Sequence, residues 1–453
     1  MFRIDAGKSS RYCDGFNRRN FLTVGLAGMG CASLGDVLRA KEQASALGHE
    51  RKDTSVILLW LDGGPGHMDL YDMKPEAPAE YRGIWNPIRS NVSGFEMTEL
   101  FPKQAQVADK FSMVRSLHHD TGDHFTGGHW MLTGRGGVSG AAAAGKYPGI
   151  GAISTKVLGS RKPGIPPYVG IPYSMSIGRR PGYFGGSYLG VQHNPFETVA
   201  DANNANFQVR NISLPKGLTV DRLEDRRSLL KSFDMLRREA DVSGALQAMD
   251  RFDEQAFEMV TGPQARQAFD IGSEDPKLRD RYGRNPWGQS TLLARRLVEA
   301  GSTFVTCHFG GWDHHWNLQS GMETYLPRID SLVSTLFEDL DQRGMAEQTL
   351  VVLCGEFSRT PRMNDGRGSG TPGRDHWGNS MFCLLGGGGV QGGRIIGSTN
   401  RLGEKPKDNP LRPGDIHHTI YRVLGVDPDT NFINHAGRPV PAIDHGRVIQ
   451  ELF

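Results

Sequence analysis

Five short apolar runs, each bounded by glycine or by polar turn residues, constrain the fold of this chain more than any other feature. They cover residues 55–62, 111–119, 302–311, 350–357 and 381–389. Apolar runs of this length are typical of strands buried on both faces of a parallel sheet. Residues 322–344 have the spacing of an amphipathic helix and lie directly before the fourth run. Such alternation predicts an α/β fold, with helices on both faces of the sheet.

A segment between the second and third runs has a different pattern. Residues 223–260 have helical spacing, many charge pairs four residues apart and no strand signal. We therefore expect a largely helical insertion over about 215–300. The formal net charge is only +2, from 52 basic and 50 acidic residues. This balance gives no large field of one sign, so nothing in it indicates nucleic acid or an acidic membrane surface as a partner.

The N-terminal residues resemble a twin-arginine export signal. Arg18 and Arg19 precede Phe21, Leu22 and a glycine- and alanine-rich stretch that is too weakly apolar and too short for a stable membrane span. Such signals are addresses read by a receptor. The resemblance implies a signal over residues 1–46, the twin-arginine export machinery as a partner, and a periplasmic or extracellular location. A basic helix retained on the mature protein is the alternative.

Acidic and histidine side chains follow four of the apolar runs at the point where each run ends. These residues are Asp62, His118 to Asp120, Asp313 to His315, and Glu356. In an open α/β sheet, ligands bind beyond the carboxyl ends of the strands, so we expect these side chains to converge. The expected cofactor is one or two divalent ions, among Zn²⁺, Mn²⁺, Fe, Mg²⁺ and Ca²⁺. Mixed carboxylate and imidazole ligands suit the first three better than Ca²⁺.

Several of these residues also have purely structural interpretations. Asp62 precedes two glycines and would suit a turn or a helix cap. A buried Glu356 requires a cation or an arginine partner, which Arg359 or Arg362 would supply. His376 follows a glycine-rich loop and has Asp375 beside it, an arrangement typical of a metal ligand with a supporting carboxylate.

Five motifs occur in order along nearly all of the chain after residue 46. They are LDGGPGHMDLYDMKP, HHDTGDHFTGGHWMLTGR, GWDHHWN, GEFSRTPRMN and GRDHWG. Together they resemble the DUF1501 family of exported bacterial proteins, a branch of the alkaline phosphatase and sulfatase superfamily. The resemblance implies one alkaline phosphatase-like domain over 47–453, with a mixed, mostly parallel central sheet and a helix over 414–428. It also implies a two-metal site, and we expect Asp62, His124, Asp313, His315, Glu356 and His376 to converge there.

The position of His124 departs from the sulfatase pattern. In sulfatases, a nucleophilic cysteine begins a turn that leads to a helix ending in Leu-Thr-Gly-Arg or Leu-Thr-Gly-Lys. Residues 132–135 match that ending, and the same spacing places His124 where the cysteine is expected. Three interpretations remain open: His124 is a metal ligand, it is a phosphohistidine-type nucleophile, or nearby Thr121 or Thr126 attacks. We favour the ligand, because histidine beside carboxylates most often binds metal.

A second departure lies at Glu356 and Phe357. The superfamily usually has an aspartate and a histidine at this strand end, so the number of metal ions stays open, and His124 is a candidate to replace the missing imidazole. The resemblance implies metal-assisted hydrolysis of a phosphate or sulfate ester, carried by a small molecule or a polysaccharide. Arg135, Arg359 and Arg362 are candidates for binding the anion. The alternatives are a non-catalytic exported binding protein and an exported metal-dependent oxidoreductase or lyase.

The twin-arginine hypothesis predicts the effect of a double substitution. Replacing Arg18 and Arg19 together with lysine should leave the uncleaved precursor inside the cell, because the export receptor reads the arginine pair. Immunoblots of cell fractions measure this, with Arg11→Lys as a matched control outside the motif. Normal export of the double variant would show that the hypothesis is wrong.

Overall fold

An eight-stranded sheet forms the centre of the fold, in the order β12-β4-β11-β8-β1-β7-β5-β6. The structure is a computed structural model that describes residues 53–138, 145–209, 212, 221–225, 256–366, 368 and 371–453. The expected export signal, with Arg18 and Arg19, lies outside the described residues. None of the helices in the described ranges is long and apolar enough to cross a membrane.

All five apolar runs form strands of this sheet, as predicted. The strands are β1 (Ser55–Asp62), β4 (Phe111–Leu117), β7 (Phe304–Gly310), β8 (Thr349–Cys354) and β11 (Met381–Gly386). Three shorter strands complete it: β5 (Tyr168–Ile171), β6 (Phe196–Glu197) and β12 (Ile395–Ile396). β1 lies at the centre and is buried along its whole length, with parallel neighbours on both sides.

One strand runs opposite to the prediction from its sequence. β11 pairs antiparallel with both β4 and β8, whereas the other pairings in the sheet are parallel. The reason lies in the connection: the chain leaves β8 and enters the adjacent β11 with no crossover helix between them in the described residues. A neighbouring strand that is reached without a crossover must be antiparallel. The sheet is therefore mixed and mostly parallel, and the expected α/β class is confirmed.

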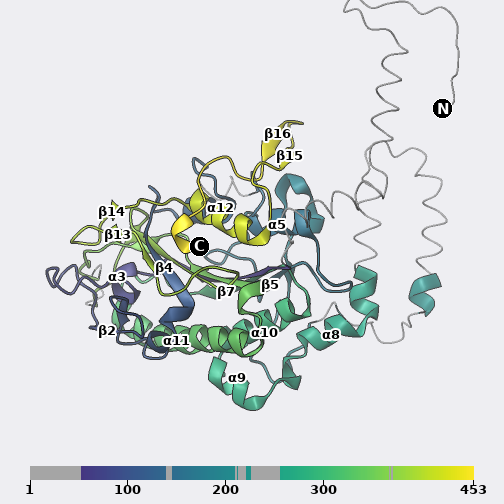
Figure 1. Ribbon diagram of the computed structural model, residues 1–453, viewed down its shortest axis with the longest axis horizontal. Helices are drawn as coiled ribbons and strands as arrows, with labels where there is room; N and C mark the ends of the chain where they lie inside the picture. The colour runs from purple at the N-terminus through teal and green to yellow at the C-terminus, as the bar shows by residue number, and fades with distance from the viewer. Residues whose placement is uncertain are drawn as a thin grey trace, which may run out of the picture. The chain divides into compact units, whose positions relative to one another are not determined.

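Helices cover both faces of the sheet (Figure 1). One hydrophobic core lies between Ile57, Leu59 and Leu61 of β1 and the helices α10 (Pro286–Ala300) and α11 (Leu318–Gln342). The other lies between the alternate residues of β1 and the helices α4, α5 and α12. Their bounds are His124–Thr133, Ile150–Leu158 and Pro413–Leu424. The helices expected over 322–344 and 414–428 are present as α11 and α12.

The described part of the expected helical insertion leads into the layer of α10 and α11. Residues 221–225 and 256–261 are helical, and α8 (Pro263–Phe269), α9 (Pro276–Tyr282) and α10 follow. α10 packs directly against β7 and β1. The wholly buried Arg295 of α10 forms ion pairs with Glu274 at 2.5 Å and with Asp339 of α11 at 2.9 Å. These pairs hold the two long helices side by side.

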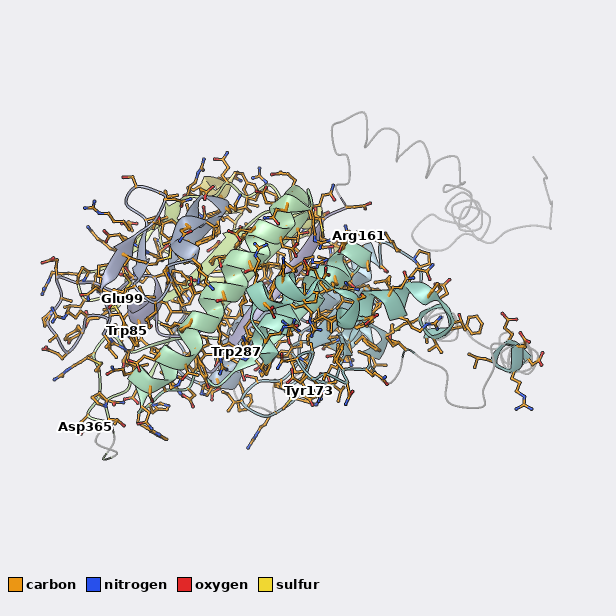
Figure 2. The ribbon with its side chains drawn as sticks, turned by 90° about the horizontal axis from the view of Figure 1, so that it is seen from below. Trp85, Glu99, Arg161, Tyr173, Trp287 and Asp365 are labelled. Atoms are coloured by element: carbon orange, nitrogen blue, oxygen red, sulfur yellow. The ribbon has the colours of Figure 1, made fainter. Side chains whose placement is uncertain are left out.

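Trp287, at the start of α10, connects this helical layer to the end of β7. Figure 2 views this face from below, with α11 crossing the sheet and Trp287 beside it. The ring centroid of Trp287 lies 5.3 Å from that of Phe309, 5.8 Å from that of Trp312 and 4.7 Å from that of Tyr325. Trp312 is fully buried. The aromatic cluster therefore fixes the loop after β7 one residue before Asp313.

Short elements surround the carboxyl ends of the strands and the edges of the sheet. They include α3 (His67–Leu70) and four two-stranded ribbons: β2 (Pro87–Arg89) with β3 (Glu96–Thr98), β9 (Ser358–Arg359) with β10 (His376–Trp377), β13 (Ser398–Thr399) with β14 (Pro406–Asp408), and β15 (Asn431–Ile433) with β16 (Pro439–Pro441). The β9–β10 ribbon matters most for function, because it pairs His376 with Arg359.

Candidate metal centre

Three histidines and one aspartate meet beyond the carboxyl ends of the central strands. The Nε2 atoms of His315 and His376 lie 2.9 Å apart, and they are 3.1 Å and 3.0 Å from Oδ1 of Asp313. Nε2 of His124 lies 3.5 Å from the other carboxylate oxygen of Asp313. His124, Asp313 and His376 present ligand atoms that all lie within 4.8 Å of one another. We name these four residues the histidine cluster.

The other ring nitrogen of each histidine faces a hydrogen-bond acceptor. The pairs are His124 with Glu356 at 2.7 Å, His315 with Asp375 at 2.6 Å, and His376 with the carbonyl of Gly122 at 2.7 Å. A neutral imidazole held in this way carries its proton on Nδ1 and directs the lone pair of Nε2 outward. Three lone pairs then face one carboxylate, an arrangement that requires a shared cation or proton.

The protonation of the cluster follows from the same contacts. Burial alone lowers the pKa of His124, but the neighbouring carboxylates of Asp313 and Glu356 outweigh it and raise that pKa to about 9. Burial alone raises the pKa of Asp313, yet His124, His376 and Arg359 together hold it well below its ordinary value. Without a metal ion, a proton on His124 therefore supplies the positive charge that the two carboxylates demand.

Among the buried side-chain atoms without a hydrogen-bond partner in the described residues, two lie at this site. Nε2 of His124 and Oε2 of Glu356 have no hydrogen-bond partner among the described residues. Buried polar atoms in native proteins are nearly always paired, so orphans in a cluster of imidazoles and carboxylates indicate a ligand. Imidazole nitrogens with a carboxylate oxygen are the donors that Zn²⁺, Mn²⁺ and Fe accept. The residues present therefore fit a divalent metal ion.

The helix α4 brings His124 to Glu356 through a glycine contact. His124 is the first residue of α4, and the side chain of Asp123 caps the helix by accepting from the backbone N–H of Thr126. At Gly127 a Cβ atom would lie 2.8 Å from the carbonyl oxygen of Glu356, so only glycine permits this approach. The ring of Phe357 packs 4.8 Å from that of His124 and 4.7 Å from that of His376. The apolar ring of Phe357 thus occupies the position at which the motif comparison led us to expect a histidine.

Asp62 lies behind Glu356, one step away from the histidine cluster. The backbone N–H of Gly63 donates to Oε1 of Glu356 at 2.8 Å. Both oxygens of Asp62 have protein partners, namely the hydroxyl of Ser176 at 3.0 Å, the N–H of Ile177 at 2.8 Å and the ring of His308 at 3.0 Å. Four of the six predicted ligands therefore form the histidine cluster. Glu356 contacts the cluster through His124, and Asp62 lies on the far side of Glu356 from it.

Two of the arginines predicted to bind the anion donate their hydrogen bonds to protein acceptors instead. Arg359 is fully buried, and its guanidinium donates to the carbonyls of Gly63, Gly64 and Arg374 and, at 2.5 Å, to Asp313. It therefore positions Asp313, with every nitrogen of the guanidinium bound to the protein.

Arg135 lies beyond the opposite end of the ten-residue helix α4, about 15 Å from His124 by the rise of an α-helix. There it binds the carboxylate of Asp444 and the carbonyl of Pro441. The structure does not bring Arg135 to the cluster, and Arg362 is exposed.

The two threonines near His124 interact with the helix cap. The hydroxyl of Thr126 donates to Asp123 at 2.7 Å, and that of Thr121 accepts from the backbone N–H of Asp123 at 3.1 Å. Neither hydroxyl has a hydrogen bond to a histidine or carboxylate of the cluster within the described residues. The only carboxylate bonded to either hydroxyl in the described residues is therefore the helix-cap residue Asp123, which lies outside the cluster.

Sequence reasoning assigned one supporting carboxylate to the wrong histidine and missed a buried arginine. Asp375 hydrogen-bonds His315, not its chain neighbour His376. Arg374 is fully buried, pairs with Asp69 at 2.9 Å and donates to four backbone carbonyls. It anchors the segment that carries Asp375 and His376. The sequence signal that could have indicated these roles was the charged pair Arg374–Asp375 directly after a glycine-rich loop.

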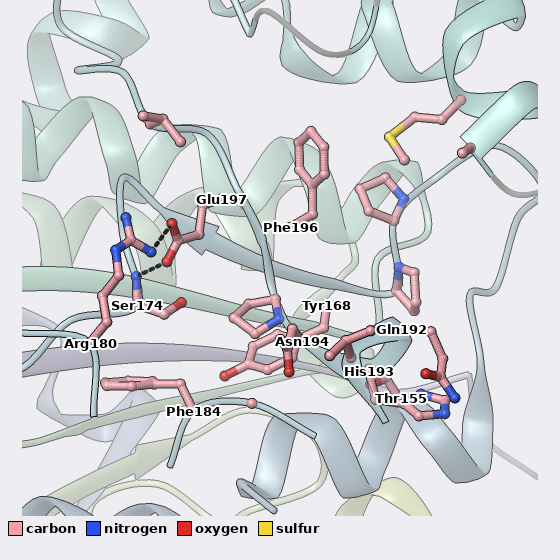
Figure 3. A pocket seen from close by; sticks show the side chains of 18 of the residues that line it. Thr155, Tyr168, Ser174, Arg180, Phe184, Gln192, His193, Asn194, Phe196 and Glu197 are labelled. Carbon is pink, nitrogen blue, oxygen red and sulfur yellow. Dashed lines mark hydrogen bonds and ion pairs between the residues drawn. The ribbon is translucent and has the colours of Figure 1, made fainter. Parts of the chain in front are cut away.

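A cavity of about 680 Å³ lies next to this region (Figure 3). Ser174, Arg180 and Phe184 line it, while Ser176 and Ile177, from the same segment, bind Asp62. The Arg180 guanidinium pairs with Glu197 inside the cavity wall. Segment 174–184 therefore contacts the cavity with some residues and the end of β1 with others.

Comparisons with known proteins identify the family of this chain. A family described as "Protein of unknown function (DUF1501)" matches residues 53–453. No curated protein matches the chain. The chain is similar to the PsFucS1 sulfatase from Pseudoalteromonas sp., with 13% identity, a TM-score of 0.38 and coverage of 86% of this chain and 70% of that one. It is also similar to the phosphonate monoester hydrolase SpPMH from Silicibacter pomeroyi, with 11% identity, a TM-score of 0.38 and coverage of 88% of this chain and 76% of that one.

The contacts of His124 predict how the stability of the metal-free protein depends on pH. Because the pKa of His124 is raised from 6.5 to about 9 on folding, its stabilisation is complete below pH 6.5 and is lost as the pH rises through 9. Burial lowers the pKa of His67 and of His119 to about 4, so these residues destabilise the folded state as the pH falls below 6.5. The free energy of unfolding, measured in urea after chelation, should be greatest at about pH 7.

A single variant separates the two limbs of this pH profile. In His124→Gln, the decline between pH 7 and 9 should be much reduced, whereas the decline on the acid side should persist. An alkaline limb that is unchanged in His124→Gln would contradict the ion pairs assigned to this residue.

Proposed function

The chain belongs to the DUF1501 family, and we propose that it is an exported, metal-dependent hydrolase of phosphate or sulfate esters. One observation carries the proposal: three imidazoles, each held through Nδ1, direct Nε2 toward the carboxylate of Asp313. The motifs that resemble the sulfatase and alkaline phosphatase superfamily support the class of substrate. Substrates of this class are esters of small molecules or of polysaccharides.

The histidine cluster would hold one divalent ion. Its ligands are His124, Asp313, His315 and His376, a set of three nitrogens and one oxygen that suits Zn²⁺, Mn²⁺ or Fe. Both oxygens of Asp62 are already bound by protein donors, which supports one ion more directly than two. When bound, a divalent ion lowers the pKa of a water molecule and polarises the ester oxygens.

The chain's own residues prepare the site by fixing protons and orientations. Glu356 and Asp375 hold the Nδ1 protons of His124 and His315, which keeps both Nε2 atoms free for a ligand. Arg359 fixes the carboxylate of Asp313. The ring of Phe357 covers the imidazoles of His124 and His376 and excludes water from that side. This preorganisation supports a ligand role for His124, since both of its nitrogens already face carboxylates.

A water molecule is the nucleophile that fits these contacts best. The hydroxyl of Thr126 donates to the helix-cap carboxylate of Asp123, and that of Thr121 accepts from a backbone N–H, so neither is bonded to a residue of the histidine cluster within the described residues. The same three histidines and carboxylate also suit redox-active iron, which makes an exported oxidoreductase the second candidate. Export itself is supported by Arg18 and Arg19, and it would place the protein in the periplasm or outside the cell.

Metal content of single variants tests the proposed ligands. His124→Ala and His376→Ala should weaken metal affinity by more than the ~10- to 100-fold typical of supporting residues, whereas Glu356→Gln should fall within that range. Thr121→Ala and Thr126→Ala, matched controls on the same loop, should retain the metal. Mass spectrometry of the bound metal, together with competition against a chelator, measures both effects.

A screen of aryl phosphate and aryl sulfate esters on the same variants tests the chemistry. Turnover should require the metal and should survive in both threonine variants. Full metal occupancy in His124→Ala, or a covalent phosphohistidine on His124, would contradict the ligand assignment. Loss of turnover in Thr121→Ala or Thr126→Ala with metal intact would identify a threonine nucleophile instead.

A further inference from the structure

An anionic ester bound at the histidine cluster requires a positively charged side chain to bind its oxygens. The structure contains an arginine for this role that the sequence analysis did not identify. Arg359 and Arg135 are bound to protein acceptors, as described above. Arg179 is exposed and has no carboxylate partner in the described part of the chain. Its guanidinium lies 5.7 Å from the ring centroid of Phe125, the residue that follows His124 in α4. Arg179 therefore presents a positive charge without a carboxylate partner in the described residues, beside the residue that follows His124 of the cluster.

A strained turn holds Arg179 in this place. The backbones of Ser176 and Arg179 exchange two hydrogen bonds of 2.9 Å, which close a tight hairpin. Its two central residues, Ile177 and Gly178, have φ angles of 44° and 70°. Such a turn favours asparagine or glycine, and a β-branched residue with positive φ is strained. Strain of this kind persists where the surroundings enforce it, often at functional sites.

Hydrogen bonds to Asp62 stabilise the turn. Its carboxylate accepts from the hydroxyl of Ser176 at 3.0 Å and from the N–H of Ile177 at 2.8 Å. Asp62 is the last residue of β1, the central strand of the sheet, and is buried. The turn is thus hydrogen-bonded to the end of the central strand, which positions the backbone of Arg179 relative to β1.

The neighbouring Arg180 has a different environment. Its guanidinium pairs with Glu197 and lies over the ring of Tyr173, and its side chain lines the cavity shown in Figure 3. Two consecutive arginines on one turn therefore differ in their partners, because one is neutralised by a carboxylate and the other is not.

We propose that Arg179 binds the tetrahedral oxyanion of the substrate ester, next to the histidine cluster. This inference rests on the proposed function and deepens it, because it names the group that recognises the anion. A guanidinium donates two parallel hydrogen bonds to a phosphate or a sulfate, and charge-assisted bonds of this kind are among the stronger ones in proteins. The guanidinium carbon lies over the ring of Phe125, and this cation–π contact restrains the side chain.

Titration calorimetry with inorganic phosphate and, separately, inorganic sulfate tests the assignment on the metal-loaded protein. Arg179→Ala should weaken binding of the preferred anion by about 10- to 100-fold, the range for loss of hydrogen bonds to a charged group. Arg180→Ala removes the same charge one residue away and should change the affinity less than about twofold. The anion that binds more tightly identifies the class of ester.

The outcomes separate this inference from the proposed function. A wild-type protein without metal would contradict the proposed hydrolase, whatever the anion data show. Metal-loaded wild-type protein that binds neither anion, or Arg179→Ala with unchanged affinity, would overturn the role of Arg179. Equal weakening by Arg180→Ala, or the main loss in Arg362→Ala, would overturn it as well, because the effect would then reflect general surface charge.

Discussion

The convergence of three imidazoles on the carboxylate of Asp313 is the interaction on which the rest of the site depends. A carboxylate with three imidazole lone pairs facing it would be electrostatically unfavourable, so the cluster requires a shared cation or proton. Every supporting contact serves this arrangement. Glu356 and Asp375 fix two of the rings, and Arg359 fixes Asp313 from behind. Arg374 anchors the strand of His376 through Asp69 and neighbouring carbonyls.

Much of this arrangement could be predicted from the sequence, because it follows from the topology of a mostly parallel sheet. Apolar runs of strand length and the amphipathic helix at 322–344 are local patterns, and their strands and helix are present. The carboxyl ends of parallel strands meet at one edge, so acidic and histidine residues at those ends come together. That argument placed Asp62, Asp313 and Glu356 in one region from positions almost 300 residues apart in the chain. His124 required the resemblance to the sulfatase motif as well.

The remaining features depend on partners that no local pattern specifies. The direction of β11 is set by the path of the chain after β8, and its apolar pattern is the same in either direction. Arg135 and Arg359 look like anion-binding residues in sequence, but their donors are taken up by carbonyls and carboxylates from distant segments. Asp375 supports His315, which lies in the loop after β7, and not its chain neighbour His376. The turn at 176–179 has a β-branched residue where a turn usually requires glycine or asparagine, so the turn could not be predicted from its sequence.

The central claim is that His124, His315, His376 and Asp313 together bind one metal ion. X-ray absorption spectroscopy of the purified protein, at the absorption edge of the metal that it carries, tests this most directly. The account predicts one kind of metal site, with three imidazole nitrogens at about 2.0–2.1 Å and a carboxylate oxygen at about 2.0–2.2 Å if the ion is zinc. A first shell made of oxygen alone, or one that contains sulfur, would contradict the account.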